Sequence, residues 1–466
     1  MGDPRGFLKV RTRRELAERP VEERIKDWFD VHTESGLQSW TTEQAARCMD
    51  CGTPFCMSGC PLGNIIPEFN DLVRQEKWED AYNRLSETNN FPEVTGRICP
   101  ALCEAACVLG IHQPATMIQN DERTIIDQAW SLDYVKPLPP QRLTDQTVAV
   151  VGSGPSGLAC AQQLTRAGHT VVVYERDDAI GGLMRYGIPN FKLDKRLIDR
   201  RVEQMEAEGT VFRTGVEIGK DISWDDLRSR YDAVVVAIGS TVPRDMKIPG
   251  RELKGIHFAM EFLPDATRRV YGVKPVNDIT AEGKHVVIIG GGDTGSDCLG
   301  TSLRQGAKDV TVLQIMPQEP KERPANQPWP TFARLYKETS SMEEGFETQR
   351  AEYVYNTDSV NFEGSDEDKA KVKVENSTAT EGFVADENGH VTGLKVVNVA
   401  PGENGPFTRQ PGTERVIPAD LVLISVGFLH PDTTTLVDQL PVDLDGRGNV
   451  ARTTSSPPPR TASCLR

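Results

Sequence analysis

TVAVVGSGPSGLACAQQLTRAGHTVVVYE, residues 147–175, contains the pattern that decides the fold of this chain. An apolar strand is followed by a glycine-rich turn, a helix rich in Ala and Leu, and a second apolar strand that ends in Glu175. Gly152 permits the tight turn, Gly154 lets the backbone approach a pyrophosphate, and Gly157 lets the helix pack closely on the strand. The pyrophosphate would lie at the positive end of the helix, and Glu175 could accept hydrogen bonds from ribose hydroxyls. The stretch therefore predicts a βαβ unit that binds a dinucleotide.

A second copy of this pattern occupies residues 284–315, in KHVVIIGGGDTGSDCLGTSLRQGAKDVTVLQI. Its glycines are Gly290, Gly292 and Gly295. The wide separation of the copies indicates a duplicated nucleotide-binding unit rather than a short-period repeat. Two further apolar stretches, 231–240 and 419–428, are typical of buried strands that run into a glycine.

The two copies differ where the ribose would bind. The position that matches Glu175 is about Gln314, and the cations Lys321 and Arg323 follow it. A missing acid with nearby cations favours a ribose that carries a 2′-phosphate, hence NADP, although the two cations could equally be ordinary surface charges. The simplest pairing is FAD in the first copy and NADPH in the second. Because such cofactors carry the redox chemistry themselves, we assign no catalytic acid or base.

Seven of the ten cysteines lie between positions 48 and 107. The first four form C-x2-C-x4-C-x3-C-P, at Cys48, Cys51, Cys56 and Cys60. Cys99, Cys103 and Cys107 recur every four residues, which predicts one face of a helix. Disulfides are rare in the reducing compartment that we expect, and zinc sites more often show paired C-x2-C knuckles. Iron–sulfur ligation is favoured, with zinc as the alternative, but seven thiolates fall short of the eight that two four-iron clusters need.

Charge and hydropathy exclude some classes of partner. The formal net charge of −15 argues against nucleic acid, whose phosphates would be repelled. There is no apolar run of about 18 residues, and the N-terminus has no apolar signal core, so we expect neither a membrane span nor secretion. These features predict a cytoplasmic protein.

The chain is expected to be an α+β multidomain protein, with a helical domain followed by two Rossmann-like α/β domains. Residues 67–89 have helical spacing of apolar side chains, and 338–392 are polar and acidic, which predicts loops and an edge hairpin. The expected domains are 1–140 (helical, cysteine-bearing), 145–250 (first nucleotide), 251–427 (second nucleotide) and 428–466 (return to the first).

Six stretches together resemble a known family, the small (β) subunits of bacterial NADPH-dependent glutamate synthases. They are CMDCGTPFCMSGCPLGN, GRICPALCEAACVLGI, VAVVGSGPSGLACAQQL, GGLMRYGIPNFKLDK, GGGDTGSDCLGTS and IMPQEPKERP. Related modules occur in dihydropyrimidine dehydrogenase and in NADPH–ferredoxin oxidoreductases. The resemblance covers residues 1 to about 450 and implies an NADPH-dependent oxidoreductase with FAD, NADPH and two 4Fe-4S clusters.

The resemblance also implies a division of the ligands. One cluster would take Cys48, Cys51, Cys56 and Cys107. The other would take Cys60, Cys99 and Cys103, and its fourth ligand aligns with Glu122, where the related dehydrogenase has a glutamine; the alternative for Glu122 is an ordinary helix-surface carboxylate. Gly182, Leu183 and Lys192 would lie near the flavin.

In this family electrons pass to a separate large (α) subunit, which makes L-glutamate from L-glutamine and 2-oxoglutarate. The alternatives are an NADPH–ferredoxin oxidoreductase, the electron-input subunit of a pyrimidine reductase, or a non-catalytic scaffold. The scaffold alternative rests on residues 452–466, RTTSSPPPRTASCLR, which replace the family's closing strand and helix and have a composition typical of disorder. We therefore expect FAD to bind weakly or not at all in this chain.

Overall fold

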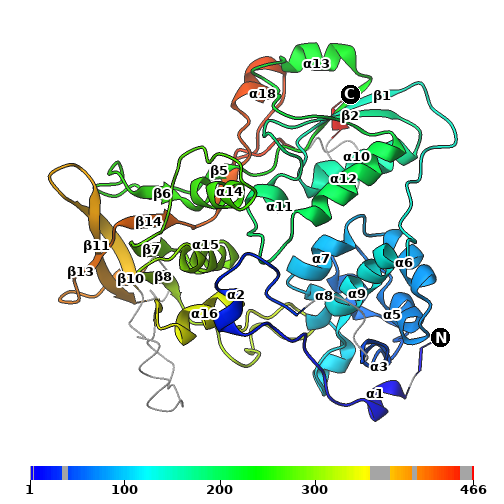
Figure 1. Cartoon of the computed structure of the whole chain (residues 1–466), viewed down its shortest axis with the longest axis horizontal. Coiled ribbons are helices and arrows are strands. Elements are labelled where there is room, and N and C mark those ends of the chain that lie inside the picture. Colours follow the sequence, from blue (N-terminus) through cyan, green and yellow to red (C-terminus); the bar gives the residue numbers. More distant parts are fainter. Residues whose placement is uncertain are drawn as a thin grey trace.

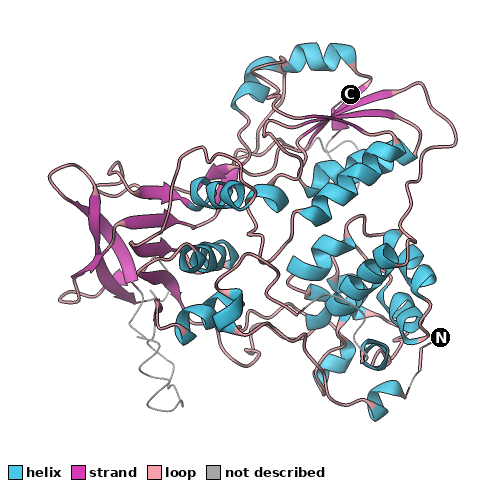
Figure 2. Ribbon diagram, in the orientation of Figure 1, coloured by secondary structure: helices cyan, strands magenta, loops and turns pink. Residues whose placement is uncertain are grey.

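The elements of the computed structural model gather into one helical unit and two units built on parallel sheets (Figure 1). The helical unit lies at the lower right of Figure 2, the first sheet unit above it and the second on the left. The structure describes residues 2–3, 5–33, 40–356, 378–400, 407–451 and 464–465.

The helical unit forms around one apolar core. Phe69, Leu85, Ile125 and Ile126 are fully buried in it, and the long central helix contributes the last two. The helices are α1 (Gly6–Lys9), α2 (Val21–Arg24), α3 (Thr41–Ala45), α4 (Phe55–Gly59), α5 (Ile66–Arg74), α6 (Trp78–Ser86), α7 (Pro92–Ile98), α8 (Leu102–Ala105) and α9 (Ile118–Ser131), with the 3-10 helix η1 (Val108–Ile111).

The helical spacing of residues 67–89 is confirmed by two helices, α5 and α6. The turn between them at Glu76, whose φ is +59°, lets both helices pack on the same core. The prediction that the second cysteine set shares one face of a helix is wrong. Cys99 ends α7 because Pro100 follows it, and Ala101 takes a left-handed φ of +56° before α8 begins.

The first sheet unit is Rossmann-like, with the strand order β16-β4-β1-β2-β3. The first four strands of the chain pair in parallel, in a register that sets Val148 beside Val171 and Ala233. The strands are β1 (Thr147–Val151), β2 (Thr170–Tyr174), β3 (Val211–Arg213), β4 (Ala233–Val236) and β16 (Cys464–Leu465), and the helices are α10 (Pro155–Arg166), α11 (Leu183–Tyr186), α12 (Arg196–Glu208) and α13 (Trp224–Arg230).

The second sheet unit repeats this design with the parallel order β6-β14-β7-β8-β9. The strands are β6 (Ile256–Phe258), β7 (His285–Ile289), β8 (Asp309–Pro317), β9 (Ala351–Asn356) and β14 (Leu421–Ile424), and the helices are α14 (Ala259–Val270), α15 (Asp293–Arg304) and α16 (Ser340–Glu347). A separate antiparallel sheet contains β10 (Thr378–Ala385), β11 (Val391–Ala400), β12 (Thr408–Arg409) and β13 (Arg415–Pro418).

The expectation for residues 338–392 is partly confirmed, although 357–377 lie outside the described residues. β10 and β11 pair antiparallel, as a hairpin should, but the stretch also contains α16 and the parallel edge strand β9. The sequence pattern missed α16 because its apolar face is short, with Met342 as its buried apolar anchor.

After β14 the chain returns to the first sheet unit. β15 (Phe428–His430) pairs with β5 (Val242–Pro243), and α18 (Thr434–Gln439) follows. Thr435 Oγ1 of α18 accepts a hydrogen bond from Trp224 Nε1 at 3.2 Å. Most of the expected disordered tail, 452–463 and Arg466, lies outside the described residues, whereas β16 pairs antiparallel with β4.

Candidate functional site

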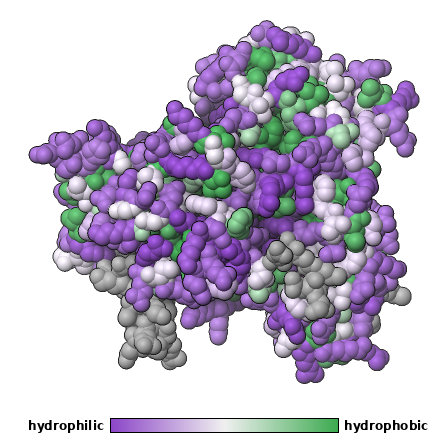
Figure 3. Space-filling view, viewed as in Figure 1, coloured by the Kyte–Doolittle hydropathy of each residue, from purple (hydrophilic) through white to green (hydrophobic). Residues whose placement is uncertain are grey.

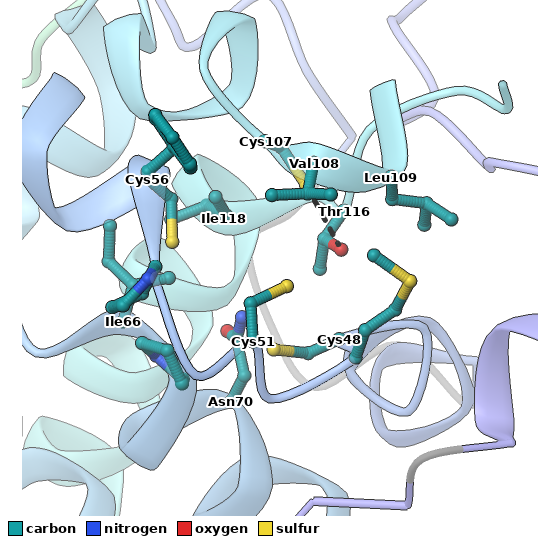
Figure 4. A pocket seen from close by; sticks show the side chains of 14 residues that line it. Cys48, Cys51, Cys56, Ile66, Asn70, Cys107, Val108, Leu109, Thr116 and Ile118 are labelled. Carbon is teal, nitrogen blue, oxygen red and sulfur yellow. Dashed lines mark hydrogen bonds between the residues drawn. The ribbon is translucent and has the colours of Figure 1, made fainter. Parts of the chain in front are cut away.

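Four cysteines that are far apart in the sequence line one cavity in the helical unit. Cys48, Cys51, Cys56 and Cys107 surround it together with apolar side chains, among them Ile66. Figure 4 shows these cysteine side chains pointing toward the same space from the cysteine loop, α4 and the start of η1. The structure thus brings together the set that the resemblance implied, and leaves Cys60 outside it.

Burial makes these thiols hard to ionise without a bound cation. It raises the pKa of Cys48 to about 11 and that of Cys56 to about 12. Arg47, which precedes Cys48, is fully buried. Its guanidinium donates to Val10 O at 3.2 Å and to Ala115 O at 3.0 Å, so it fixes the segment that follows Cys107.

The second candidate set lies around Glu122. Cys60, Cys99 and Glu122 interact electrostatically: burial, followed by the charges of Glu122 and Cys60, raises the pKa of Cys99. The pKa of Cys103 is raised by burial and then by Glu122. Glu122 is itself buried and not at the helix surface, and burial raises the pKa of its carboxyl to about 7.

Glu122 is held in place by two neighbours. Its carboxylate accepts hydrogen bonds from Asn64 Nδ2 at 2.8 Å and from Thr95 Oγ1 at 3.2 Å. Thr95 belongs to α7, which ends at Cys99, and Asn64 follows the cysteine loop. These bonds use some of the acceptor positions of the carboxylate and leave others for a ligand.

The cysteines fit an extended inorganic group better than a single ion. None of the nine cysteines from Cys48 to Cys298 forms a disulfide in the described part of the chain. Within the described ranges, no three His, Cys, Asp or Glu side chains are placed to hold one metal ion. A zinc ion would need its thiolates to converge at about 2.3 Å from one point, whereas the four thiols of the first set surround a cavity.

The first glycine fingerprint has the shape that a pyrophosphate needs. Gly152 has a φ of +102°, and a Cβ on Gly157 would come within 2.0 Å of Gly152 O. Gly154, the N-cap of α10, would place a Cβ in open space, which leaves room for a phosphate there. Gly182 has a φ of +53° and packs against Gly154, and the half-exposed Leu183 begins α11 beside it.

Glu175 contacts this same turn. Its Oε2 accepts from Ser153 N at 2.9 Å and from Ser153 Oγ at 2.5 Å, and its Oε1 accepts from Asp177 N at 2.9 Å. Each carboxylate oxygen can accept two hydrogen bonds, so capacity for a ribose hydroxyl remains chiefly at Oε1.

The second fingerprint has the same turn geometry as the first, with a glutamine in place of the glutamate. Gly290 has a φ of +110°, a Cβ on Gly295 would lie 1.9 Å from Gly290 O, and Gly292 faces open space. Gln314 takes the place of Glu175 on β8, and its Nε2 donates to Gly291 O at 3.2 Å.

The two cations proposed for the 2′-phosphate differ in their surroundings. Arg323 donates to the backbone carbonyls of Gln327 at 2.9 Å, Thr331 at 2.6 Å and Ala105 at 3.3 Å, so it ties its loop to the helical unit. Lys321 is exposed on the same loop.

Lys192 joins the two sheet units. Its Nζ lies 2.5 Å from Oδ1 of Asp297, a buried residue of α15. Sequence reasoning missed Asp297, because an isolated acid two residues after a fingerprint glycine gives no signal of its own. It also missed Trp329, whose ring lies 4.7 Å (between centroids) from that of Phe55, a residue that lines the cysteine cavity.

Comparisons with known proteins agree with this division of the chain. Residues 24–134 match the family model of dihydropyrimidine dehydrogenase domain II, 4Fe-4S cluster, and residues 146–456 match that of pyridine nucleotide-disulphide oxidoreductases. The glutamate synthase [NADPH] small chain of Mycobacterium tuberculosis is 50% identical over 457 residues, which cover 97% of this chain and 88% of that one. The chain belongs to the glutamate synthase small-chain family.

Other small chains are more distant members of the family. That of Bacillus subtilis is 43% identical and that of Escherichia coli 33%, with 92% and 93% of this chain covered and 85% and 86% of theirs. Mycobacterium tuberculosis FprA in complex with NADPH is a structural neighbour with a TM-score of 0.48 and 20% identity, over 67% of this chain and 77% of that one. Across the residues that the structure describes, every helix is too short or too polar to cross a membrane.

Proposed function

We propose that this chain is the electron-input subunit of an NADPH-dependent glutamate synthase. The observation that carries the proposal is the cavity lined by Cys48, Cys51, Cys56 and Cys107, on the same chain as two glycine fingerprints with open phosphate positions. The small-chain relatives, one of them 50% identical over nearly the whole length, support the same function.

The proposed ligand assignment comes from the family resemblance, and the cavity lined by the first cysteine set supports it. The cavity cysteines would hold one 4Fe-4S cluster, and Cys60, Cys99, Cys103 and Glu122 the other. The first fingerprint with Glu175 and Gly182 would bind FAD, and the second would bind NADPH with Lys321 near the ribose. When these groups are bound, NADPH supplies two electrons as hydride, FAD accepts the pair, and the clusters pass electrons on one at a time.

Helix α7 links the proposed FAD unit to the second cysteine set. Phe91 and Val94 pack into the core of the first sheet unit, and Asn90 Nδ2 donates to Gln162 Oε1 at 2.8 Å. The buried Glu93 pairs with Arg201 of α12 at 2.7 Å. Since α7 ends at Cys99, we propose that electrons leave FAD through the Glu122 set and reach the cavity set second.

The partner and location follow from the family. We propose that the cavity set delivers electrons to a large glutamate synthase subunit, and that the complex works in the cytoplasm. The surface in Figure 3 is mostly hydrophilic, as expected for a chain with a net charge of −15. Nothing in this assignment involves nucleic acid or a membrane.

The decisive experiment is an anaerobic titration of the purified chain with NADPH. Bleaching of both the flavin and the iron–sulfur absorbance is the result expected from the match to the pyridine nucleotide-disulphide oxidoreductase family, and it would overturn the expectation of weak FAD binding drawn from residues 452–466. Iron–sulfur absorbance with no flavin band would show that this chain does not retain FAD and would favour the scaffold alternative. A chain that responds fully but reduces ferredoxin rather than a large subunit would instead be an NADPH–ferredoxin oxidoreductase.

Replacement of Glu122 tests the eighth ligand. We expect Glu122→Gln to keep its cluster and to raise the reduction potential by on the order of 100 mV, because a neutral ligand replaces an anion close to the iron. Glu122→Ala is expected to lose that cluster. Potentiometric titration followed by electron paramagnetic resonance measures both, and an unchanged potential in Glu122→Gln would show that Glu122 is not a ligand.

Replacement of Asp297 tests the contact between the sheet units. In Asp297→Asn the Lys192 ammonium loses its charged partner, so we expect flavin reduction at saturating NADPH to slow roughly tenfold while FAD stays bound. Stopped-flow absorbance measures the rate. If the variant reduces flavin at the unaltered rate, the contact between Lys192 and Asp297 has no role in hydride transfer between the two nucleotides.

A further inference from the structure

The N-terminal segment leaves the helical unit and lies on the second sheet unit. In Figure 1, α2 lies beside α16 rather than among the other helices of its own unit. An isolated antiparallel bridge between Glu18 and His32 closes residues 18–32 into a loop, which we call the strap. The strap therefore connects the helical unit to the unit proposed to bind NADPH.

A buried group of charges fastens the strap. Arg24, Arg304 and Glu344 are each 1% exposed or less in their side chains. Arg24 Nε donates to Glu344 Oε1 at 2.8 Å, and Arg304 donates to both oxygens of Glu344 at 2.6 and 2.9 Å. Arg24 also pairs with Glu18 at 2.7 Å and with Glu343. Buried charges are costly unless they are paired, so removal of one partner of this group would leave an uncompensated buried charge.

The buried charged group contacts the first sheet unit at Phe191. The Arg304 guanidinium lies 3.8 Å from the centroid of the Phe191 ring, and Trp28 of the strap packs against that ring at 6.3 Å. Val31 N donates to Phe191 O at 3.1 Å. A Cβ on Gly300 of α15 would lie 2.8 Å from Phe191 Cζ, so this ring fills the space between strap and helix.

Phe191 precedes Lys192, which pairs with Asp297 three residues before Gly300 on the same helix. The loop that carries Lys192 is thus fixed to α15 at two points, and the strap holds one of them. Asn190 Nδ2 also donates to Trp28 O at 2.8 Å. The strap therefore contacts the loop expected near the flavin at the place where that loop packs on the second fingerprint helix.

We propose that the strap sets the relative position of the two nucleotide-binding units, and that Arg24 is a positioning residue for hydride transfer from NADPH to FAD. In that step NADPH loses a hydride and becomes NADP⁺, and the flavin gains the same two electrons. Arg24 belongs to neither fingerprint and would act through Glu344, Arg304 and Phe191. The inference rests on the proposed function, because it assumes that both nucleotides bind where the fingerprints lie.

The test compares two electron-transfer steps in the full chain. In Arg24→Met we expect flavin reduction at saturating NADPH to slow roughly 10- to 100-fold, since misplacement by about 1 Å can cost that much. We expect the NADPH dissociation constant and the FAD content to change less than about twofold, and the nicotinamide–flavin charge-transfer absorbance to weaken. Transfer from photoreduced flavin to the clusters should keep its rate, because it depends on the separate Glu93–Arg201 contact.

Two further variants separate positioning from loss of fold. Phe191→Leu leaves every buried charge paired. It should likewise slow flavin reduction and leave the rate of transfer to the clusters unchanged. Arg84→Met is the matched control, because Arg84 also bridges two carboxylates, Glu68 and Glu87, but at the surface of one unit. Equal slowing of both steps in Arg24→Met and Phe191→Leu, or no slowing in either, overturns the proposal. Failure of the proposed function would show differently, as no bleaching by NADPH in the unaltered chain.

Discussion

Cys56→Ser is expected to remove one of the two clusters and with it about half of the roughly eight irons per chain. Cys56 lies in the cavity where four thiols meet, and a serine hydroxyl is a much poorer ligand for iron than a thiolate. The variant should still reduce its flavin with NADPH, because that step precedes the clusters. It should no longer pass electrons to a large subunit. Iron and acid-labile sulfide analysis, together with stopped-flow absorbance, measures both effects.

Cys160→Ser is the matched control for this variant. Cys160 is a half-buried residue of α10 that forms no disulfide and lies outside both candidate sets, so its replacement should leave the iron content unchanged. If Cys56→Ser retains all of its iron, the cavity set does not hold a cluster. If instead both variants lose iron, general instability rather than ligation explains the loss.

The sequence predicted the sheet units well because their signal is local. Both fingerprints form a strand, a turn and a helix, and Gln314 stands where the acid of the first copy would be. The grouping of Cys107 with the cysteine loop could not be predicted in this way, because the spacing of the cysteines does not require it. That grouping came from the family resemblance, and the structure then placed these cysteines around one cavity.

The contacts between units could not be predicted from the sequence pattern. Arg24 forms a hydrogen bond with Glu344, 320 positions away in the sequence, and Arg323 forms one with Ala105, 218 positions away. Such pairs produce no periodic pattern in the sequence, because the packing of the units, and not the neighbouring residues, determines which side chains come together. Arg323 is an example: the cation expected to serve a phosphate also donates to three backbone carbonyls, which the sequence pattern did not indicate.

Gly157→Ala and Gly295→Ala are each expected to weaken the binding of a different nucleotide. Each added methyl would collide with a backbone oxygen of its own fingerprint turn, at 2.0 Å from Gly152 O and at 1.9 Å from Gly290 O. Backbone cannot move aside cheaply, and overpacking of this kind costs about 1–3 kcal/mol, which corresponds to roughly 5- to 150-fold in affinity. We expect Gly157→Ala to lose FAD, and Gly295→Ala to keep FAD while binding NADPH much more weakly.

Each of these variants is the control for the other, and Gly446→Ala controls for the added methyl, because a Cβ there meets no atom within 4 Å. Flavin absorbance after gel filtration reports FAD, and titration with NADPH reports the second site. The opposite pattern, with FAD lost in Gly295→Ala and retained in Gly157→Ala, would reverse the assignment of the two units. If both variants keep FAD and bind NADPH with the affinity of the unaltered chain, the close approach at these turns does not govern nucleotide binding. The expected split would instead show that one chain holds two nucleotides in two copies of one design, distinguished at the ribose position by Glu175 and Gln314.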